Sequence, residues 1–74
     1  MTDNIVGYAV YTAERKPRYF AGMMRGEPVL STRAEDMHIF ERESAAETMR
    51  LLVEERTGKG AKITEVMEGV KVDG

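Results

Sequence analysis

Only one stretch of this chain combines helical periodicity with clear start and stop signals, and it is short. Apolar residues recur at helical spacing from Ala46 to Val53, after Ser44 opens a Ser-x-x-Glu capping box. Gly58 suits a helix C-cap, and Arg56 in the preceding turn complements the helix dipole. We therefore expect one helix over residues 45–57, so that strands must supply the rest of the fold.

Runs of β-branched and aromatic residues predict those strands. The first run reads Ile-Val-Gly-Tyr-Ala-Val-Tyr-Thr, and a polar turn that ends at Pro17 separates it from the second. The last run follows the glycines around Lys59, and a turn or bulge at Glu68 and Gly69 precedes a final short segment. The expected strands are residues 5–12, about 18–23, 29–32, 61–67 and 70–72.

This order predicts an α+β fold, a small antiparallel sheet of three to four strands with one helix packed on one face. The order is strand, strand, short strand, helix, strand. In the first strand, Val6, Tyr8 and Val10 share a face, and the small residues Gly7 and Ala9 on the other face leave room for a close neighbour. The face opposite the helix is expected to stay exposed unless a partner covers it.

A second capping box, from Thr32 to Glu35, predicts one helical turn between the third strand and the helix. Three apolar residues after that turn are expected to point inward. They are Met37, Ile39 and Phe40.

The 74 residues are expected to form a single domain, residues 1–74, without disulfides or a thiolate metal site, because the chain contains no cysteine. Absence of cysteine fits a reducing, cytoplasmic setting. The longest apolar run is far shorter than a membrane span, and the N-terminus lacks the features of a signal peptide. No membrane partner is expected.

Catalytic chemistry has little support in the sequence. His38 is the only histidine, so a zinc site would need carboxylates for its other ligands, and a serine nucleophile would have one possible base. Gly58-Lys59-Gly60 lacks the spacing of a phosphate-binding loop. We expect no cofactor, no metal and no enzymatic activity.

Charge is distributed unevenly, and two candidate binding surfaces follow from it. Residues 1–33 carry five basic and three acidic side chains, and residues 34–74 carry six basic and ten acidic ones, which gives +2 and −4. The acidic candidate is expected to face a basic groove. It consists of Glu35, Asp36, Glu41, Glu43, Glu47 and Glu54. The basic aromatic candidate has the composition of a surface for single-stranded nucleic acid. It consists of Arg15, Lys16, Arg18, Tyr19 and Arg25.

Several short motifs resemble a pattern of small uncharacterised proteins from bacteriophages and prophages, although Met37 stands where that pattern has alanine. The motifs are Tyr8-Ala9-Val10-Tyr11, Arg18-Tyr19-Phe20-Ala21-Gly22, Pro28-Val29-Leu30-Ser31-Thr32, His38-Ile39-Phe40 and Ala45-Ala46-Glu47. The resemblance implies a protein-interaction module of the anti-CRISPR kind, a phage-encoded inhibitor that occludes a host protein or ribonucleoprotein defence complex in the cytoplasm. A nucleic-acid binder and a homo-oligomeric accessory protein, for example a homodimer, are the alternatives.

Overall fold

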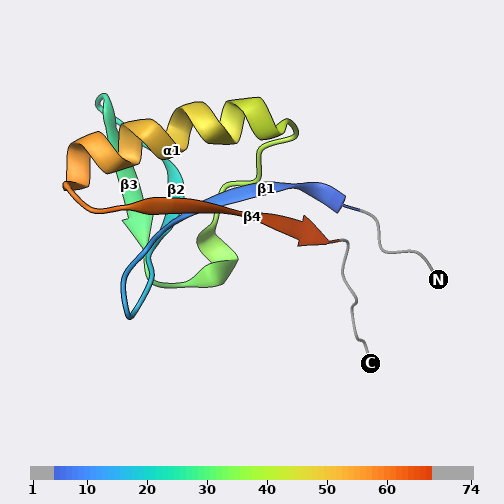
Figure 1. Cartoon of the computed structure of the whole chain (residues 1–74), viewed down its shortest axis with the longest axis horizontal. Coiled ribbons are helices and arrows are strands. Elements are labelled where there is room, and N and C mark those ends of the chain that lie inside the picture. The colour runs from blue at the N-terminus through green and yellow to red at the C-terminus, as the bar shows by residue number, and fades with distance from the viewer. Residues whose placement is uncertain (1–4, 68–74) are drawn as a thin grey trace.

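A computed structural model describes residues 5–67 of the chain (Figure 1). Three strands, a short 3₁₀ turn, one helix and a last strand follow one another, which confirms the predicted α+β class and element order. The elements are β1 (Ile5–Thr12), β2 (Tyr19–Met24), β3 (Glu27–Ser31), η1 (Ala34–Asp36), α1 (Glu43–Thr57) and β4 (Ala61–Met67). The expected turn at Glu68 and the segment 70–72 lie outside the described residues. No helix in the described part of the chain is long and apolar enough to cross a membrane.

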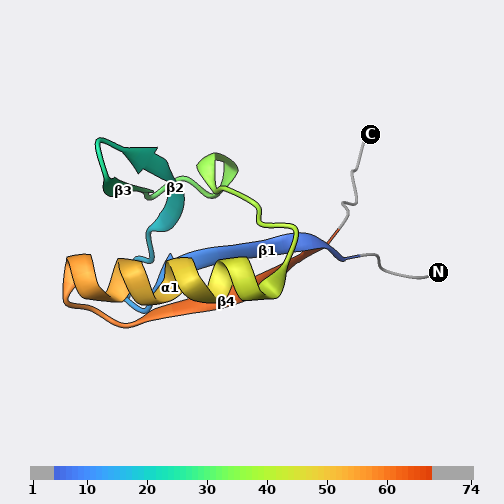
Figure 2. The same cartoon turned by 90° about the horizontal axis from the view of Figure 1, so that it is seen from above.

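The four strands form one antiparallel sheet in the order β3-β2-β1-β4, so the last strand lies beside the first. β1 and β4 pair without interruption from Gly7 with Val66 to Thr12 with Ala61, and a shift of register between Ile5 and Gly7 precedes the last pair, Ile5 with Met67. β1 and β2 pair only where Tyr11 faces Tyr19. Beyond that point the β2–β3 hairpin swings away from the β1–β4 ladder (Figure 2).

The segment between η1 and α1 fills the wedge where β1 and β2 separate. The N–H of His38 donates to the Phe20 carbonyl on β2 at 2.8 Å, and Tyr8 and Phe40 exchange two backbone hydrogen bonds of 2.8 Å. A Cβ on Gly7 would lie 2.5 Å from the Phe40 carbonyl oxygen, so only glycine allows this approach. The small-residue face of β1 therefore does receive a close neighbour, as predicted. That neighbour is the chain itself.

Helix α1 packs on the other face of the β1–β4 ladder (Figure 1). Ala46 and Val53 are fully buried, and they meet Val10, Phe20 and Ala61 in the core. Partly buried apolar residues surround this cluster. They are Tyr8, Leu30, Phe40, Met49 and Ile63. Because alanine occupies two of the five core positions, helix and sheet approach closely, and the core is small.

The ends of α1 confirm one predicted cap and correct the other. Gly58 adopts the left-handed conformation with φ of 75°, and its N–H donates to the Glu54 carbonyl at 2.9 Å. The predicted capping box is wrong, because the helix begins earlier, at Glu43, with Arg42 as N-cap and no side-chain cap. A carboxylate in the first turn complements the helix dipole in place of the missing cap.

The second predicted capping box is also not formed. The hydroxyl that bonds the start of this turn belongs to Ser31 and not to Thr32. It accepts the Arg33 N–H at 3.1 Å and donates to Asp36 at 2.8 Å. Of the three apolar residues predicted to point inward, Ile39 is 42% exposed. Met37 already has extended dihedral angles, and side chains along an extended segment alternate between its two sides. Phe40 faces the core, so Ile39 cannot.

Candidate functional site

The pairing register divides the side chains of the sheet between two faces. Val10 pairs with Ile63 on the face that packs against α1, whereas Ala9 pairs with Thr64 on the opposite face. We call this opposite surface the open face. It is not uniformly uncovered, since Gly7 and Ala9 are buried there. The open face is therefore exposed, as expected, only at the end of the β1–β4 ladder that contains Tyr11.

One row of residues crosses all four strands at that uncovered end. Lys62, Tyr11, Tyr19 and Ser31 are successive pairing partners on β4, β1, β2 and β3. The two tyrosine rings are half-buried and tilted by 42°, with centroids 6.1 Å apart, and Lys62 is exposed. The open face thus presents two adjacent aromatic rings beside a cation.

The loop between β1 and β2 adds basic side chains to the same side of the molecule. The loop projects from the β1–β4 ladder on the side away from α1 (Figure 1). Arg15 and Lys16 are exposed on this loop. The buried Thr12 hydroxyl accepts the Arg18 N–H at 2.9 Å, which holds the base of the loop closed.

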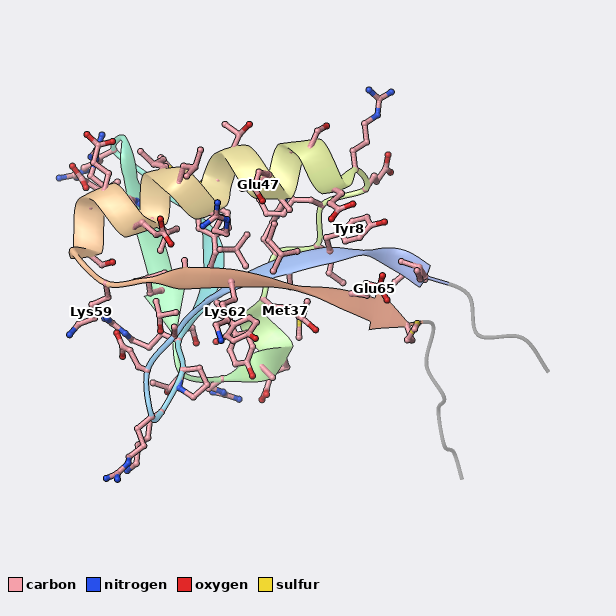
Figure 3. The ribbon with its side chains drawn as sticks, in the orientation of Figure 1. Tyr8, Met37, Glu47, Lys59, Lys62 and Glu65 are labelled. Carbon is pink, nitrogen blue, oxygen red and sulfur yellow. The ribbon has the colours of Figure 1, made fainter. Side chains whose placement is uncertain are left out.

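Glu14 is the acidic residue of this loop, and Arg18 holds it at 2.9 Å. The hydrogen bond from Arg18, helped by its positive charge, lowers the pKa of Glu14 below its usual value. Figure 3 shows Lys59 and Lys62 below the β1–β4 ladder as well, with α1 above it. The strand end and the loop therefore form one predominantly basic surface.

Arg25 is separated from this surface. It lies in the turn between β2 and β3, and that turn is tied to the C-terminal end of α1. Arg56 donates to the Glu27 carboxylate at 2.7 Å and to the Gly26 carbonyl at 3.5 Å. The structure thus brings Arg15, Lys16, Arg18 and Tyr19 of the basic aromatic set together and leaves Arg25 apart.

The six residues of the acidic set do not share one surface. Glu35 and Asp36 belong to η1, which lies below the β1–β4 ladder in Figure 1, whereas α1 lies above it. Their carboxylates are held locally, Glu35 by Arg33 at 2.8 Å and Asp36 by the Ser31 hydroxyl. Glu41 and Glu43 are exposed where the chain enters α1.

On α1, the two remaining members of the acidic set are committed to one arginine. Arg50 binds both Glu47 and Glu54, the latter at 3.0 Å. The hydrogen bond from Arg50 and its charge lower the pKa of Glu47. Glu54 also accepts the Ala61 N–H at 2.9 Å, so this carboxylate joins the helix to β4. Glu54 is half-buried, so its carboxylate serves the fold and is not part of an exposed acidic surface.

Sequence reasoning missed Lys62, Thr64 and Lys59 as members of a basic surface. Strand alternation alone could have placed Lys62 and Thr64 on one face. The pairing of Lys62 with Tyr11 depends on a register between residues 51 positions apart, which no local signal carries.

His38 forms part of an aromatic cluster. Its ring meets Phe40 edge-on with centroids 4.5 Å apart and Phe20 at 5.9 Å. Within residues 5–67, no group of three histidine, aspartate or glutamate side chains is placed to hold a metal ion, and no pocket is present.

Comparison of the chain with protein-family models, with curated proteins and with solved structures finds no match.

Proposed function

We propose that this protein is a binding module without enzymatic activity, and that its open face holds an extended single strand of nucleic acid. The row formed by Lys62, Tyr11 and Tyr19 carries this proposal. Aromatic rings on a sheet surface stack on bases of any sequence, while lysine and arginine beside them neutralise the phosphates.

Segregation of charge supports this assignment despite the net charge of −2. The loop beside the open face carries one carboxylate, Glu14, which Arg18 holds. Two more, Glu35 and Asp36 of η1, lie on the same side of the sheet, and Arg33 and the Ser31 hydroxyl hold them. The surface also carries several cations. The cations are Arg15, Lys16, Arg18, Lys59 and Lys62. A local excess of one sign attracts a polyanion even when the whole chain is acidic, because salt screens charges more than about 8 Å away.

The test is fluorescence anisotropy with a labelled single-stranded oligonucleotide of about ten nucleotides, within the range of site sizes for small sheet domains. In the test variant, Lys16→Gln is combined with Lys62→Gln. The control combines Arg25→Asn with Arg42→Gln and so removes two charges from other parts of the fold. We expect the test variant to bind more weakly and to lose roughly 1.4 from the slope of log affinity against log salt, as two lost phosphate contacts require. The control should bind like the parent.

A third variant addresses the aromatic part of the row. Tyr11→Leu keeps an apolar side chain between its neighbours but removes the stacking surface, and it should cost about 1–3 kcal/mol of binding free energy. No binding by the parent at about 50 mM salt would rule out the nucleic-acid function. Equal losses of oligonucleotide affinity in the test variant and the control variant would rule out the open face as the binding surface.

A second candidate function, the phage-encoded inhibitor that occludes a host defence complex, is favoured by a different observation. Leu51 is 53% exposed on the solvent side of α1. Glu47, Glu54 and Glu55 lie three or four residues from it and therefore border it on the helix surface. An exposed apolar side chain with a charged rim has the anatomy of a small protein interface.

Cleavage by a purified RNA-guided host effector complex tests the inhibitor. Leu51→Asp combined with Glu55→Lys changes this surface but spares Glu47 and Glu54, which bind Arg50. If the parent inhibits cleavage through α1, this double variant should not. The Lys16→Gln and Lys62→Gln pair is the matched control, and it should inhibit as the parent does. Undiminished inhibition by the helix variant would contradict a role for α1.

A further inference from the structure

The pairing pattern of β1 determines where the backbone groups of β4 point. Tyr8 and Thr12 use their N–H groups on the side of β2, toward Phe40 and Arg18. Since backbone groups alternate along a strand, Ala9 and Tyr11 turn theirs toward β4 and bond Thr64 and Lys62. The N–H and C=O groups of Ala61, Ile63 and Glu65 consequently point away from the sheet.

An independent contact confirms this orientation. The Ala61 N–H donates to the Glu54 carboxylate at 2.9 Å, so it points outward and is already occupied. No strand of the described residues pairs with Ile63 and Glu65 on that side, because β4 is the last strand of the sheet order. Two consecutive outward positions of β4 are therefore available to a new strand.

The two edges of the sheet differ in how they are protected. β3, the other edge strand, contains Pro28, which has no N–H to offer, and its first residue Glu27 is bound by Arg56. β4 contains no proline, and two apolar residues, Ile63 and Val66, lie among its polar residues Lys62, Thr64 and Glu65. This contrast marks β4 as the edge on which strand addition is permitted.

We propose that a second copy of this chain adds to β4 as an antiparallel strand, related by a two-fold axis that passes through Thr64. In this register Ile63 of each copy pairs with Glu65 of the other copy. These pairs use all the outward N–H and C=O groups of both residues. Thr64 then faces its own copy, and Lys62 faces Val66. No two like charges stand opposite each other.

The neighbouring two-fold registers are less favourable for specific reasons. An axis through Glu65 opposes two glutamates, and like charges directly opposite destabilise a strand pair. An axis through Ile63 requires the Ala61 N–H, which Glu54 has already taken. Thr64 is therefore the centre that charge and hydrogen bonding select.

Pairing of two copies also suits the size of the domain. The core cluster of buried residues has five members, two of them alanine, and small domains of this kind commonly gain stability from a second subunit. The two four-stranded sheets would join into a continuous sheet with both helices on one side. Half-buried Ile63 and Val66 would each gain a covering side chain across the new strand pair.

Sedimentation velocity of the full chain, from about 10 μM to about 1 mM, tests the proposal, because mass action favours the dimer as concentration rises. The parent should approach twice the 8.3 kDa of one chain. Thr64→Lys and Thr64→Glu each place like charges across the axis and should raise the dimer dissociation constant roughly tenfold or more. Residue 64 is exposed, so neither change disturbs the core. Circular dichroism of each variant verifies the fold.

Mixing the two variants is the decisive step. The new lysine of one chain would face the new glutamate of the other only if the axis passes through residue 64, so the mixture should recover a dimer that neither variant forms alone. Thr32→Lys and Thr32→Glu, at another exposed threonine, serve as controls and should behave as the parent does. A parent that stays monomeric, variants that dimerise normally, or a mixture that stays monomeric would each overturn the proposal. If the parent is monomeric, the strand that adds to the β4 edge must come from another protein.

Discussion

Gly7 is the residue on which the path of the chain between β2 and α1 depends. Its missing side chain lets the Phe40 carbonyl come within 2.5 Å of the position that a Cβ would take, and Tyr8 and Phe40 hydrogen bond beside it. Gly7→Ala must push these segments apart, so we expect it to destabilise the fold by about 1–3 kcal/mol in urea unfolding.

Gly60→Ala is the matched control for that change. A Cβ at residue 60 would meet its nearest neighbour, the Ala13 side chain, at 3.7 Å, an ordinary contact distance. We expect it to be neutral or slightly stabilising, because alanine reduces the freedom of the unfolded chain. Equal losses for the two substitutions would show that Gly7 has no special role.

Arg25 is strained by the turn in which it lies. Arg25 and Gly26 have φ values of 54° and 80°, the two positive angles that a type I′ hairpin turn requires. Asparagine tolerates this conformation far better than arginine. Arg25→Asn should therefore stabilise the protein by about 1 kcal/mol, measured as a higher urea midpoint. Gly26→Ala should lower the midpoint, and a lower midpoint for Arg25→Asn would contradict the assignment of strain to this turn.

At the scale of elements, the helix and β4 are joined by one side chain. Glu54 binds Arg50 and accepts the Ala61 N–H, whereas Glu55 is exposed and makes neither contact. Glu54→Ala should cost about 1 kcal/mol in unfolding free energy for the lost hydrogen bonds. Glu55→Ala should be close to neutral, and this comparison removes the effect of helix propensity and of charge. Equal stability of the two variants would show that Glu54 does not link the elements.

Local pattern predicted the elements well and their caps poorly. The bounds of β1 and β4 and the Gly58 cap followed from residue type, because strand alternation and the left-handed conformation are local properties. Both capping boxes failed. Ser44 and Thr32 have suitable hydroxyls, but the pairing of Phe40 with Tyr8 and the turn at Ser31 decide where the chain enters the helical conformation.

At the scale of the molecule, stability should depend on pH through two carboxylates. The pKa values of Glu14 and Glu47 are lowered in the folded protein, first by hydrogen bonds from Arg18 and Arg50 and then by their charges. A lowered pKa stabilises the fold at pH values above the unfolded pKa, and that stabilisation is lost as the pH falls through the folded pKa. The urea midpoint should therefore be lower at about pH 3 than at about pH 7.

A double variant isolates this effect from other acidic groups. Glu14→Gln with Glu47→Gln keeps the size of both side chains but removes their titration, so its urea midpoint should change less between the two pH values. A pH dependence identical to that of the parent would show that these two ion pairs do not contribute.

Residue order alone determined that this chain has one short helix among strands, where those elements lie, and which of their faces are apolar. These are local properties, set by side-chain periodicity and by the conformations that glycine and proline permit. Only the tertiary structure decided which distant residues meet. It aligned Lys62 with Tyr11 and Tyr19 and bound Glu54 to Ala61. It also separated the acidic residues of η1 from those of α1. The physical reason is that strand register and helix placement depend on how the whole core packs, and side chains far apart in sequence share a surface only once that packing is complete.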